Sequence, residues 1–202
     1  MSKPTIIIIT GAPGTGKTTL GRQLAADLKL PFVYKDGIKE RLYDTMGLQD
    51  REWSRQLGRA AYALLEHFAE VLLQAGKSFI IESNFHKELA LPMFVGLQER
   101  WGYRPLQIWC QTEPELLLER FKARTAAGTR HPGHQDELVH EHFTAEKLAA
   151  SYGFFDIGGD CVVWETTDFS AVDYGRLLGQ VARFGESADR KTLTQRRKGA
   201  KN

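Results

Sequence analysis

The segment Gly11–Thr18 carries the clearest chemical signal in the sequence. Its residues, Gly-Ala-Pro-Gly-Thr-Gly-Lys-Thr, match the phosphate-binding pattern G-x-x-x-x-G-K-[ST] at every fixed position. Glycines let the backbone N–H groups of such a loop point inward at a phosphate. In this pattern Lys17 reaches the β- and γ-phosphates of a nucleotide, and the hydroxyl of Thr18 binds Mg²⁺.

The surroundings of this segment separate it from a chance glycine-rich turn. A β-branched, apolar run precedes it, and a run with leucines at four-residue spacing follows it, so it joins a strand to a helix as the pattern requires. ATP and Mg²⁺ are therefore the predicted ligands. The residues predicted to bind the nucleotide are Gly11, Ala12, Pro13, Gly14, Thr15, Gly16, Lys17, Thr18 and Thr19.

Hydrophobic patterning predicts strands that alternate with helices along the chain. Short apolar runs predict buried strands, and apolar residues three or four apart predict helices. The predicted strands are 5–10, 32–34, 78–81, 105–110 and 161–165. The predicted helices are 17–28, 38–45, 53–72, 88–100, 112–124, 138–150 and 172–184, the fifth opening on a capping box at 112–115 with Pro114 just inside it.

This alternation predicts an α/β fold of three layers, with a parallel five-stranded sheet between helices on both faces. Right-handed crossovers place the carboxyl ends of all parallel strands at one edge of the sheet, where ligands of open α/β sheets bind. The residues expected at this edge are Gly11–Thr18, Asp36, Glu82–Asn84, Thr112 and Thr166–Asp168.

The position of the phosphate loop, the chain length and the element order resemble the P-loop kinases related to nucleoside monophosphate kinases. Within that group, the chain is similar to gluconate kinase, shikimate kinase, chloramphenicol phosphotransferase and the kinase domain of polynucleotide kinase. The likeness covers Thr5–Phe184 and implies a P-loop NTPase fold with the first strand at the centre. It also implies one kinase domain over residues 1–186, with a small lid at about 124–137. A GTPase is disfavoured because the guanine motif N-K-x-D is missing, and a motor ATPase because there is no second domain.

Two acidic residues at the expected edge acquire roles through this resemblance. In similar kinases an aspartate after the second strand contacts the acceptor hydroxyl as a base, which implies this role for Asp36. Glu82 ends a strand that looks like a Walker B strand with Glu in place of Asp, and it would hold Mg²⁺ through a water molecule. The two roles could also be exchanged, and Asp36 could instead be an ordinary turn residue beside Gly37.

The resemblance also implies catalytic arginines in the lid. Arg120 and Arg124 share one face of a predicted helix, and Arg130 follows in a loop rich in Gly, Pro and His. Guanidinium groups suit the charge on a phosphoryl group in transfer, although surface charge is the plain alternative. A second set, Arg41, Arg55 and Arg59, would flank the acceptor pocket or simply be solvated.

Four histidines, His131, His134, His140 and His142, raise the question of a metal site. No cysteine accompanies them and their spacing fits no closed zinc site, so lid or substrate contacts are the preferred interpretation. Cys110 and Cys161 both lie in apolar runs and are expected to be buried free thiols.

Composition and charge restrict the protein class further. The apolar fraction of 42% and the charged fraction of 26% are ordinary for a soluble globular protein. The net charge of +2 conceals a basic tail, since seven Lys/Arg and two Asp/Glu follow from Arg183 onward. Residues 187–202 are expected to be a disordered tail. No segment resembles a secretory signal or a membrane span, so a cytoplasmic monomer or homodimer is expected.

The sequence therefore predicts an ATP-dependent kinase that acts on a hydroxyl group of a small molecule. One alternative is a 5′-hydroxyl polynucleotide kinase, to which the basic tail would attract the strand, although the rest of the chain is not basic. Another alternative is a non-catalytic regulator that binds ATP. The acceptor cannot be read from the fold, because pocket shape decides it.

Overall fold

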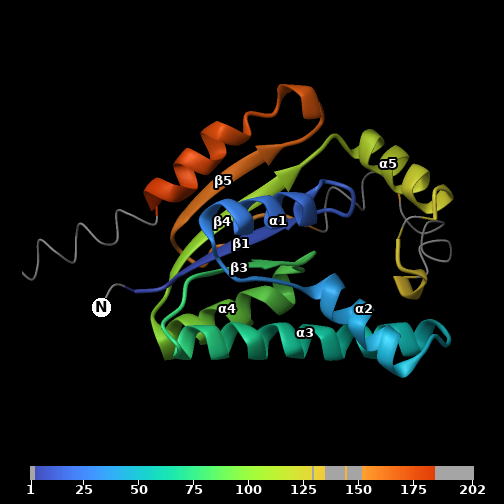
Figure 1. The fold of residues 1–202 in the computed structure, drawn as a ribbon, viewed down its shortest axis with the longest axis horizontal. Coiled ribbons are helices and arrows are strands. Elements are labelled where there is room, and N and C mark those ends of the chain that lie inside the picture. The colour runs from blue at the N-terminus through green and yellow to red at the C-terminus, as the bar shows by residue number, and fades with distance from the viewer. Residues whose placement is uncertain (1–2, 129, 135–143, 145–151, 185–202) are drawn as a thin grey trace, which may run out of the picture.

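A parallel sheet forms the middle layer of the protein, seen here in a computed structural model that describes residues 3–128, 130–134, 144 and 152–184 (Figure 1). The described strands are β1 (Thr5–Gly11), β2 (Phe32–Tyr34), β3 (Phe79–Glu82), β4 (Arg104–Gln111) and β5 (Asp160–Glu165). They form a five-stranded sheet in the order β2-β3-β1-β4-β5, and each neighbouring pair is parallel. The predicted sheet, with the first strand in its centre, is confirmed.

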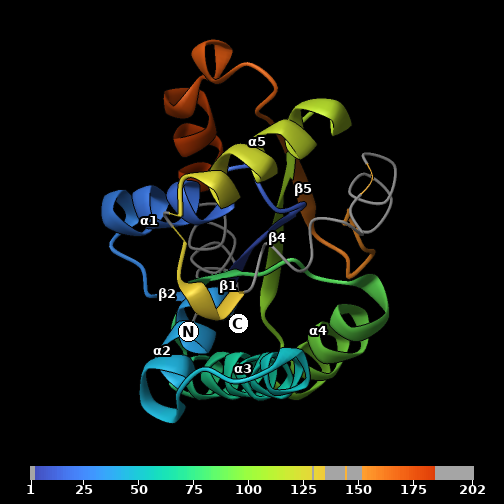
Figure 2. The same cartoon turned by 90° about the vertical axis from the view of Figure 1, so that its right-hand side faces the viewer.

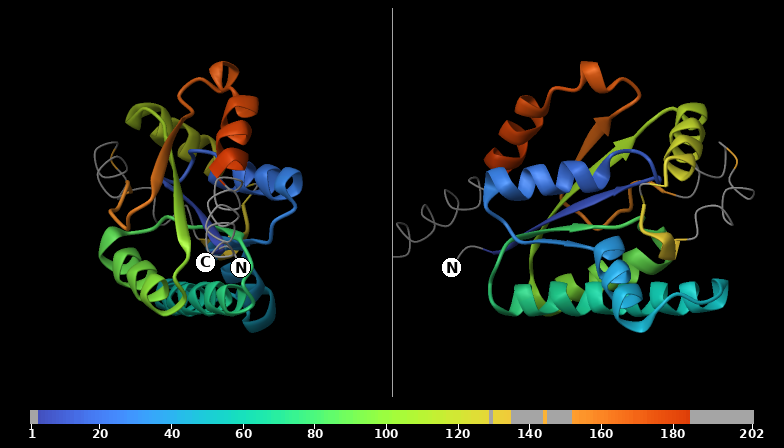
Figure 3. Two further views of the ribbon diagram at one scale, coloured as in Figure 1. Left: turned by 90° about the vertical axis from the view of Figure 1, so that its left-hand side faces the viewer. Right: turned by 45° about the vertical axis from the view of Figure 1, so that its right-hand side comes forward.

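Helices cover both faces of this sheet (Figures 1, 2 and 3). The helices are α1 (Lys17–Leu28), α2 (Lys35–Met46), α3 (Arg51–Gln74), α4 (Lys87–Trp101), α5 (Pro114–Ala126) and a helix over 174–184. Helix α1 and the helix 174–184 lie on one face, whereas α3 and α4 lie on the other. The predicted three-layer α/β class is therefore confirmed.

The alternation of side chains in β1 explains why the sheet is buried on both faces. Ile6 and Ile8 pack with the cluster that contains Leu65 of α3. Ile7 and Ile9 point the other way, into the cluster that contains Leu24 of α1. All seven residues of β1 are buried, and the six before Gly11 are β-branched Thr or Ile, which suits a strand that is covered on both faces.

Several predicted helix starts differ from the structure by one to three residues, and the largest difference matters for the site. Helix α2 begins at Lys35 and not at residue 38, so Asp36 lies in the first turn of a helix. Helix α5 begins at Pro114 after Glu113, and among the described residues no side chain caps it. The expected capping hydroxyl of Thr112 instead contacts Thr166 beside the end of β5.

The cysteine prediction is half correct. Both residues are free thiols, but only Cys110 is buried, because Cys161 lies on the edge strand β5, whose residues are largely exposed. The helix predicted at 138–150 and the tail predicted at 187–202 fall mostly or wholly outside the described residues. Within the described part of the chain, no helix has the length and apolar character needed to cross a membrane.

A buried glutamine of β4 pairs with the backbone of the segment that precedes β5. Gln107 of β4 is fully buried, and its Nε2 donates to the carbonyl oxygen of Phe155 at 2.8 Å. The backbone N–H of Phe155 donates in return to Oε1 of Gln107 at 3.4 Å. The side-chain amide thus pairs with a backbone as a neighbouring strand would, which satisfies polar groups that are otherwise costly to bury.

Replacement of this amide should destabilise the protein without touching the site. We expect Gln107→Leu to lower the free energy of unfolding by about 1–3 kcal/mol, since it leaves the buried backbone groups of Phe155 unpaired. Urea unfolding followed by circular dichroism measures this loss. Gln74→Leu on the exposed end of α3 is the control, with an expected change within about 0.5 kcal/mol. Equal effects of the two substitutions would contradict the pairing role.

Candidate active site

The phosphate loop is fixed by the backbone geometry of its glycines. Gly11 has a φ of 141°, and a Cβ at this position would lie 2.3 Å from the carbonyl oxygen of Cys110 in β4. Gly16, with a φ of 81°, sits in the left-handed region directly before α1. These positions require glycine because other residues would be strained or would clash, so the loop follows directly from its sequence.

Lys17 occupies the place that the motif predicts, at the first position of α1. Its ammonium Nζ donates to the carbonyl oxygen of Ala12 in the loop at 2.8 Å. The side chain is buried, which lowers the pKa of Lys17, whereas the nearby Glu82 opposes that shift. The ammonium group of Lys17 is thus removed from water and hydrogen-bonded to a carbonyl group of the loop. A phosphate group would bind this ammonium group more strongly than the carbonyl does.

Thr18 and Glu82 come together from α1 and β3. The Thr18 hydroxyl donates to Oε2 of Glu82 at 2.8 Å. Burial raises the pKa of Glu82, and the ammonium of Lys17 partly offsets that effect. A hydroxyl and a carboxylate oxygen are hard donors of the kind that Mg²⁺ prefers, and a cation would stabilise the ionised form of this buried carboxylate. The pair therefore fits the predicted role in holding Mg²⁺.

A cavity of about 260 Å³ joins most of the predicted site residues. Its described lining is Pro13, Gly14, Gly16, Lys17, Thr18, Thr19, Asp36, Glu82, Asn84, Arg120, Arg124 and Arg130. Helices α1, α2 and α5 and strand β3 contribute to it, as the sheet-edge argument predicts. The lining carries four Lys/Arg and two Asp/Glu, a balance that favours a polyanion such as a triphosphate.

Arg120 of α5 contacts both polar groups and an aromatic ring. One Arg120 nitrogen donates to the Thr167 carbonyl at 3.0 Å, and another lies 3.4 Å from the hydroxyl of Thr112. Its guanidinium carbon also stands 4.2 Å from the centre of the Phe169 ring. Arg124, one turn later, stands 5.3 Å from the centre of the Phe121 ring. Helix α5 thus presents both guanidinium groups to the cavity.

Arg130 reaches Asp36 from the other side of the cavity. The two side chains form a hydrogen-bonded ion pair between the segment 130–134 and the first turn of α2. Burial alone would raise the pKa of Asp36, but Arg130, then His134 and the nearby lysines lower it to about 2. Asp36 is therefore ionised throughout the neutral range, and it can accept a hydrogen bond from a hydroxyl group.

Other predicted residues lie apart from this cavity. Arg55 and Arg59 both pair with Glu52 on the exposed surface of α3. Arg41 pairs with Asp44 and is also exposed. These exposed pairs favour the interpretation of solvated helix faces for all three arginines.

The loop after β3 is only partly in the cavity, and the histidines form no metal cluster in the described residues. Asn84 lines the cavity, whereas the ring of His86 lies against that of Tyr152, with 5.0 Å between centroids. Searched over the described residues, which exclude His140 and His142, the chain has no group of three or more potential metal ligands.

Sequence reasoning missed the partners of His131 and His134. His134 Nε2 lies 2.9 Å from Oε1 of Glu40, and His131 Nε2 lies 3.1 Å from Oδ1 of Asp44. Both acids belong to α2, at four and eight residues after Asp36. That spacing places three carboxylates on one helix face. The sequence therefore contains a pattern that could have indicated an acidic face for basic partners.

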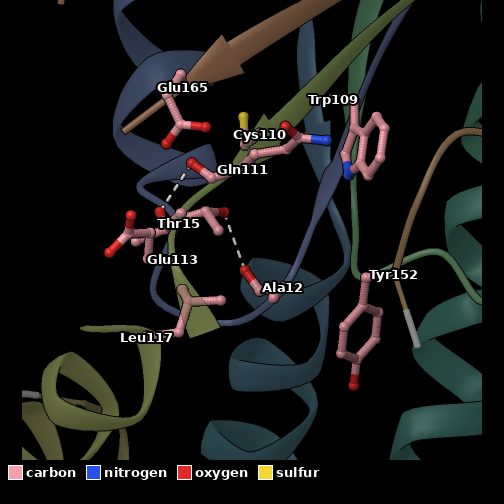
Figure 4. Close-up of a pocket in the computed structure, with 10 residues that line it drawn as sticks. Ala12, Thr15, Trp109, Cys110, Gln111, Glu113, Leu117, Tyr152 and Glu165 are labelled. Carbon is pink, nitrogen blue, oxygen red and sulfur yellow. Dashed lines mark hydrogen bonds between the residues drawn. The ribbon is translucent and has the colours of Figure 1, made fainter. Parts of the chain in front are cut away.

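A second recess of about 260 Å³ lies behind the phosphate loop (Figure 4). The rings of Trp109 and Tyr152 form one side of it, with Ala12 and Leu117 across from them. Its described lining includes the acids Glu113 and Glu165 but no lysine or arginine. The cavity that holds Lys17 is the better candidate for phosphate, because its described lining carries four Lys/Arg.

Comparison with known proteins identifies the family. The model of the AAA domain family matches residues 6–148, which is more than half of the chain. The chain belongs to the AAA domain family. The chain is also similar to a protein of known structure from Chloroflexus aurantiacus that is provisionally named a kinase. The two are 35% identical, with a TM-score of 0.81 over 93% of this chain and 99% of the other.

Shikimate kinases are also similar to this AAA domain protein. The enzyme of Bacteroides fragilis is 29% identical over 122 residues, which cover 54% of this chain and 66% of the enzyme. The enzyme of Bacteroides thetaiotaomicron is 30% identical, over 54% of this chain and 67% of the enzyme. The chain thus spans about two thirds of the length of these relatives, and slightly less than two thirds of the Bacteroides fragilis enzyme.

A more distant structure shares the fold alone. The APS kinase of Mycobacterium tuberculosis, solved with AMPPNP and APS, has a TM-score of 0.58 at 14% identity over 92% of this chain and 99% of the other. The family match and the kinase relatives above confirm the resemblance to the small-molecule branch of the P-loop kinases.

The Asp36–Arg130 pair generates a prediction for stability against pH. Arg130→Met should destabilise the protein most above pH 4, and the difference from the wild type should shrink as the pH falls towards 2. A carboxyl with a folded pKa of about 2 stabilises the protein above its unfolded value near 3.8, and that contribution is lost as the pH falls through the folded value.

Urea unfolding of both proteins between pH 2 and pH 7 tests this dependence. Arg55→Met is the matched control, since its ion pair with Glu52 is exposed and should give only a small difference. A stability difference for Arg130→Met that grows towards pH 2 would contradict the predicted sign.

Proposed function

We propose that this protein is an ATP- and Mg²⁺-dependent kinase that transfers the γ-phosphoryl group of ATP to a hydroxyl group of a small molecule. The supporting observation is that one cavity is lined by the phosphate loop, by the Thr18–Glu82 pair and by the Asp36–Arg130 pair. The first two suit a nucleotide with its metal, and the third suits an acceptor beside the transferred group. The kinase relatives support the same class of reaction.

The residues of the cavity have different roles in the proposed phosphoryl transfer. Lys17 exchanges its contact with the Ala12 carbonyl for the β- and γ-phosphates. Thr18 and Glu82 would hold Mg²⁺, Glu82 through water, and the ion would supply neutralisation of phosphate charge. Arg120, Arg124 and Arg130 stabilise the charge on the phosphoryl oxygens in the transition state.

Asp36 acts on the acceptor. It orients the hydroxyl by accepting its hydrogen bond, and it takes the proton as the new O–P bond forms and the bond from the γ-phosphorus to the bridging oxygen of ADP breaks. A carboxylate with a pKa of about 2 is a weak base. A weak base is sufficient because the transition state of phosphoryl transfer is loose and the hydroxyl loses its proton late.

A screen of acceptors tests the proposal directly. The purified protein is incubated with ATP and Mg²⁺ and with hydroxylated metabolites, antibiotics, nucleosides or oligonucleotides that carry a 5′-hydroxyl, and ADP release is followed. ADP release that depends on a small hydroxyl compound supports the proposal. Activity confined to oligonucleotides, with a steep salt dependence, would establish the polynucleotide alternative. ATP binding without turnover on any acceptor would establish a regulator.

Lys17→Ala should abolish this phosphoryl transfer and leave the fold intact. The substitution removes the cation that acts on the phosphates, while the core clusters do not depend on its ammonium group. ATP affinity, turnover and the circular dichroism spectrum are the three measurements. Lys122→Ala on the exposed side of α5 should retain wild-type turnover. Wild-type turnover in Lys17→Ala would refute the role of the loop.

Asp36→Asn should lower turnover by about 10²–10⁴-fold and change ATP affinity far less. The amide keeps the size of the side chain and can still form hydrogen bonds, but it cannot accept the proton. ATP affinity is measured without acceptor, and turnover is measured at saturating acceptor. A loss below about tenfold would exclude Asp36 as the base and transfer that role to Glu82.

A further inference from the structure

Helix α2 presents a row of carboxylates to the segment 130–134. Asp36, Glu40 and Asp44 are four residues apart and share one helix face. Each of them meets one basic side chain of the segment, since Arg130 pairs with Asp36, His134 with Glu40 and His131 with Asp44. We call these six residues the clasp. Three matched pairs between five consecutive residues and one helix face indicate a specific docking contact.

Close packing accompanies these polar contacts. The His131 ring stacks on the Tyr43 ring at 5.7 Å between centroids. A Cβ on Gly133 would lie 2.2 Å from the Tyr43 ring, so the segment approaches α2 as closely as it does only because residue 133 is glycine. The Ser54 hydroxyl of α3 also points at the Gly133 carbonyl, at 3.5 Å.

The pair of His134 and Glu40 is the buried part of the clasp. The His134 side chain is 5% exposed and the Glu40 side chain 33%. Burial lowers the pKa of His134, and Arg130 lowers it further, whereas Asp36 and Glu40 oppose the shift. A hydrogen bond to the ionised carboxylate of Glu40 requires a proton on Nε2 of His134, and the neutral ring can carry that proton.

His131 fastens the segment in the same way. Its Nδ1 accepts a hydrogen bond from the backbone N–H of Gly133 at 3.1 Å, which leaves the proton of the neutral ring on Nε2. That nitrogen then donates to Asp44. Both histidines thus contact a carboxylate of α2 through Nε2.

We propose that Glu40 and His134 are positioning residues, which fasten the segment 130–134 to α2 and thereby hold the guanidinium group of Arg130 at Asp36 on the cavity wall. The inference rests on the proposed function, in which Arg130 acts on the phosphoryl group and Asp36 on the acceptor. Arg130 is only four residues from His134, so the anchor fixes its backbone. An anchored arginine has less side-chain freedom to lose in the transition state.

Side-chain NMR of Arg130 tests the docking without any assay of activity. The Nε–Hε resonance of Arg130 is assigned by its loss in Arg130→Lys, and slow exchange with water marks the docked guanidinium group. We expect Glu40→Ala and Gly133→Ala to bring this exchange to the rate of an exposed arginine. Glu40→Gln keeps an acceptor oxygen for His134 and should preserve the slow exchange. Glu52→Ala, which alters exposed pairs on α3, is the control.

Kinetics then test the consequence for catalysis. We expect Glu40→Ala to lower kcat by about 10–100-fold, with a smaller change in the KM for ATP, and Glu40→Gln to restore most of the loss. In an Arg130→Met background, Glu40→Ala should change kcat by less than about twofold, because the residue acts through Arg130.

The outcomes separate this inference from the proposed function. Unchanged Arg130 exchange in both Glu40→Ala and Gly133→Ala overturns the clasp, even if the wild-type protein is an active kinase. Independent effects of Glu40→Ala and Arg130→Met on kcat overturn the positioning role. If the wild-type protein phosphorylates no acceptor, the proposed function fails, and the NMR result still decides whether Glu40 and His134 dock the segment.

Discussion

The geometry of the site depends on the complete burial of β1 between β3 and β4. Because all of its residues are buried, the strand cannot shift in register without moving isoleucines out of two core clusters. The parallel register aligns Ile9 with Glu82 and Gly11 with Cys110. This alignment sets the start of the phosphate loop beside the carboxylate that Thr18 contacts, so the core determines the relative positions of the loop and the candidate metal site.

The two acids of the cavity are held in opposite electrostatic conditions. Asp36 has a guanidinium partner and a low pKa, whereas Glu82 is buried beside a hydroxyl and a single lysine and has a raised pKa. A carboxylate that is already ionised and paired suits the binding of a neutral hydroxyl. A carboxylate that a cation would stabilise suits a metal site. This difference favours the assignment of Asp36 to the acceptor and Glu82 to Mg²⁺ over the exchanged assignment.

Sequence reasoning predicts the sheet and the phosphate loop because both are written in local patterns. The apolar run of β1 and the glycines of Gly11–Thr18 determine their own conformations. Asp36 and Arg130 are 94 residues apart in the chain, and no local pattern predicts their contact. The start of α2 at Lys35 was also missed, since the turn residues Asp36 and Gly37 suggested a loop. Tertiary packing determines both the contact between Asp36 and Arg130 and the start of α2. As a result, Asp36 lies in the first turn of a helix.

The lid contacts show a further limit of sequence patterns. The types of His131 and His134 raise the question of a metal site, but nothing in their local sequence indicates their partners on α2. The carboxylate row at four-residue spacing was present in the sequence. It becomes meaningful only when the fold brings α2 opposite the segment 130–134, as the pairs of His131 and His134 show.

The contact between Gly11 and the Cys110 carbonyl limits where the protein can adapt to its ligands. Gly11 is both the last residue of β1 and the first residue of the phosphate loop, and it lies against the backbone of β4. The loop cannot widen unless the centre of the sheet opens. In the proposed function, the nucleotide would meet a preformed loop, and any fit to different acceptors would come from α2 and the segments that face it. Variation of acceptor among related chains should then leave the loop unchanged and alter the helix that carries Asp36.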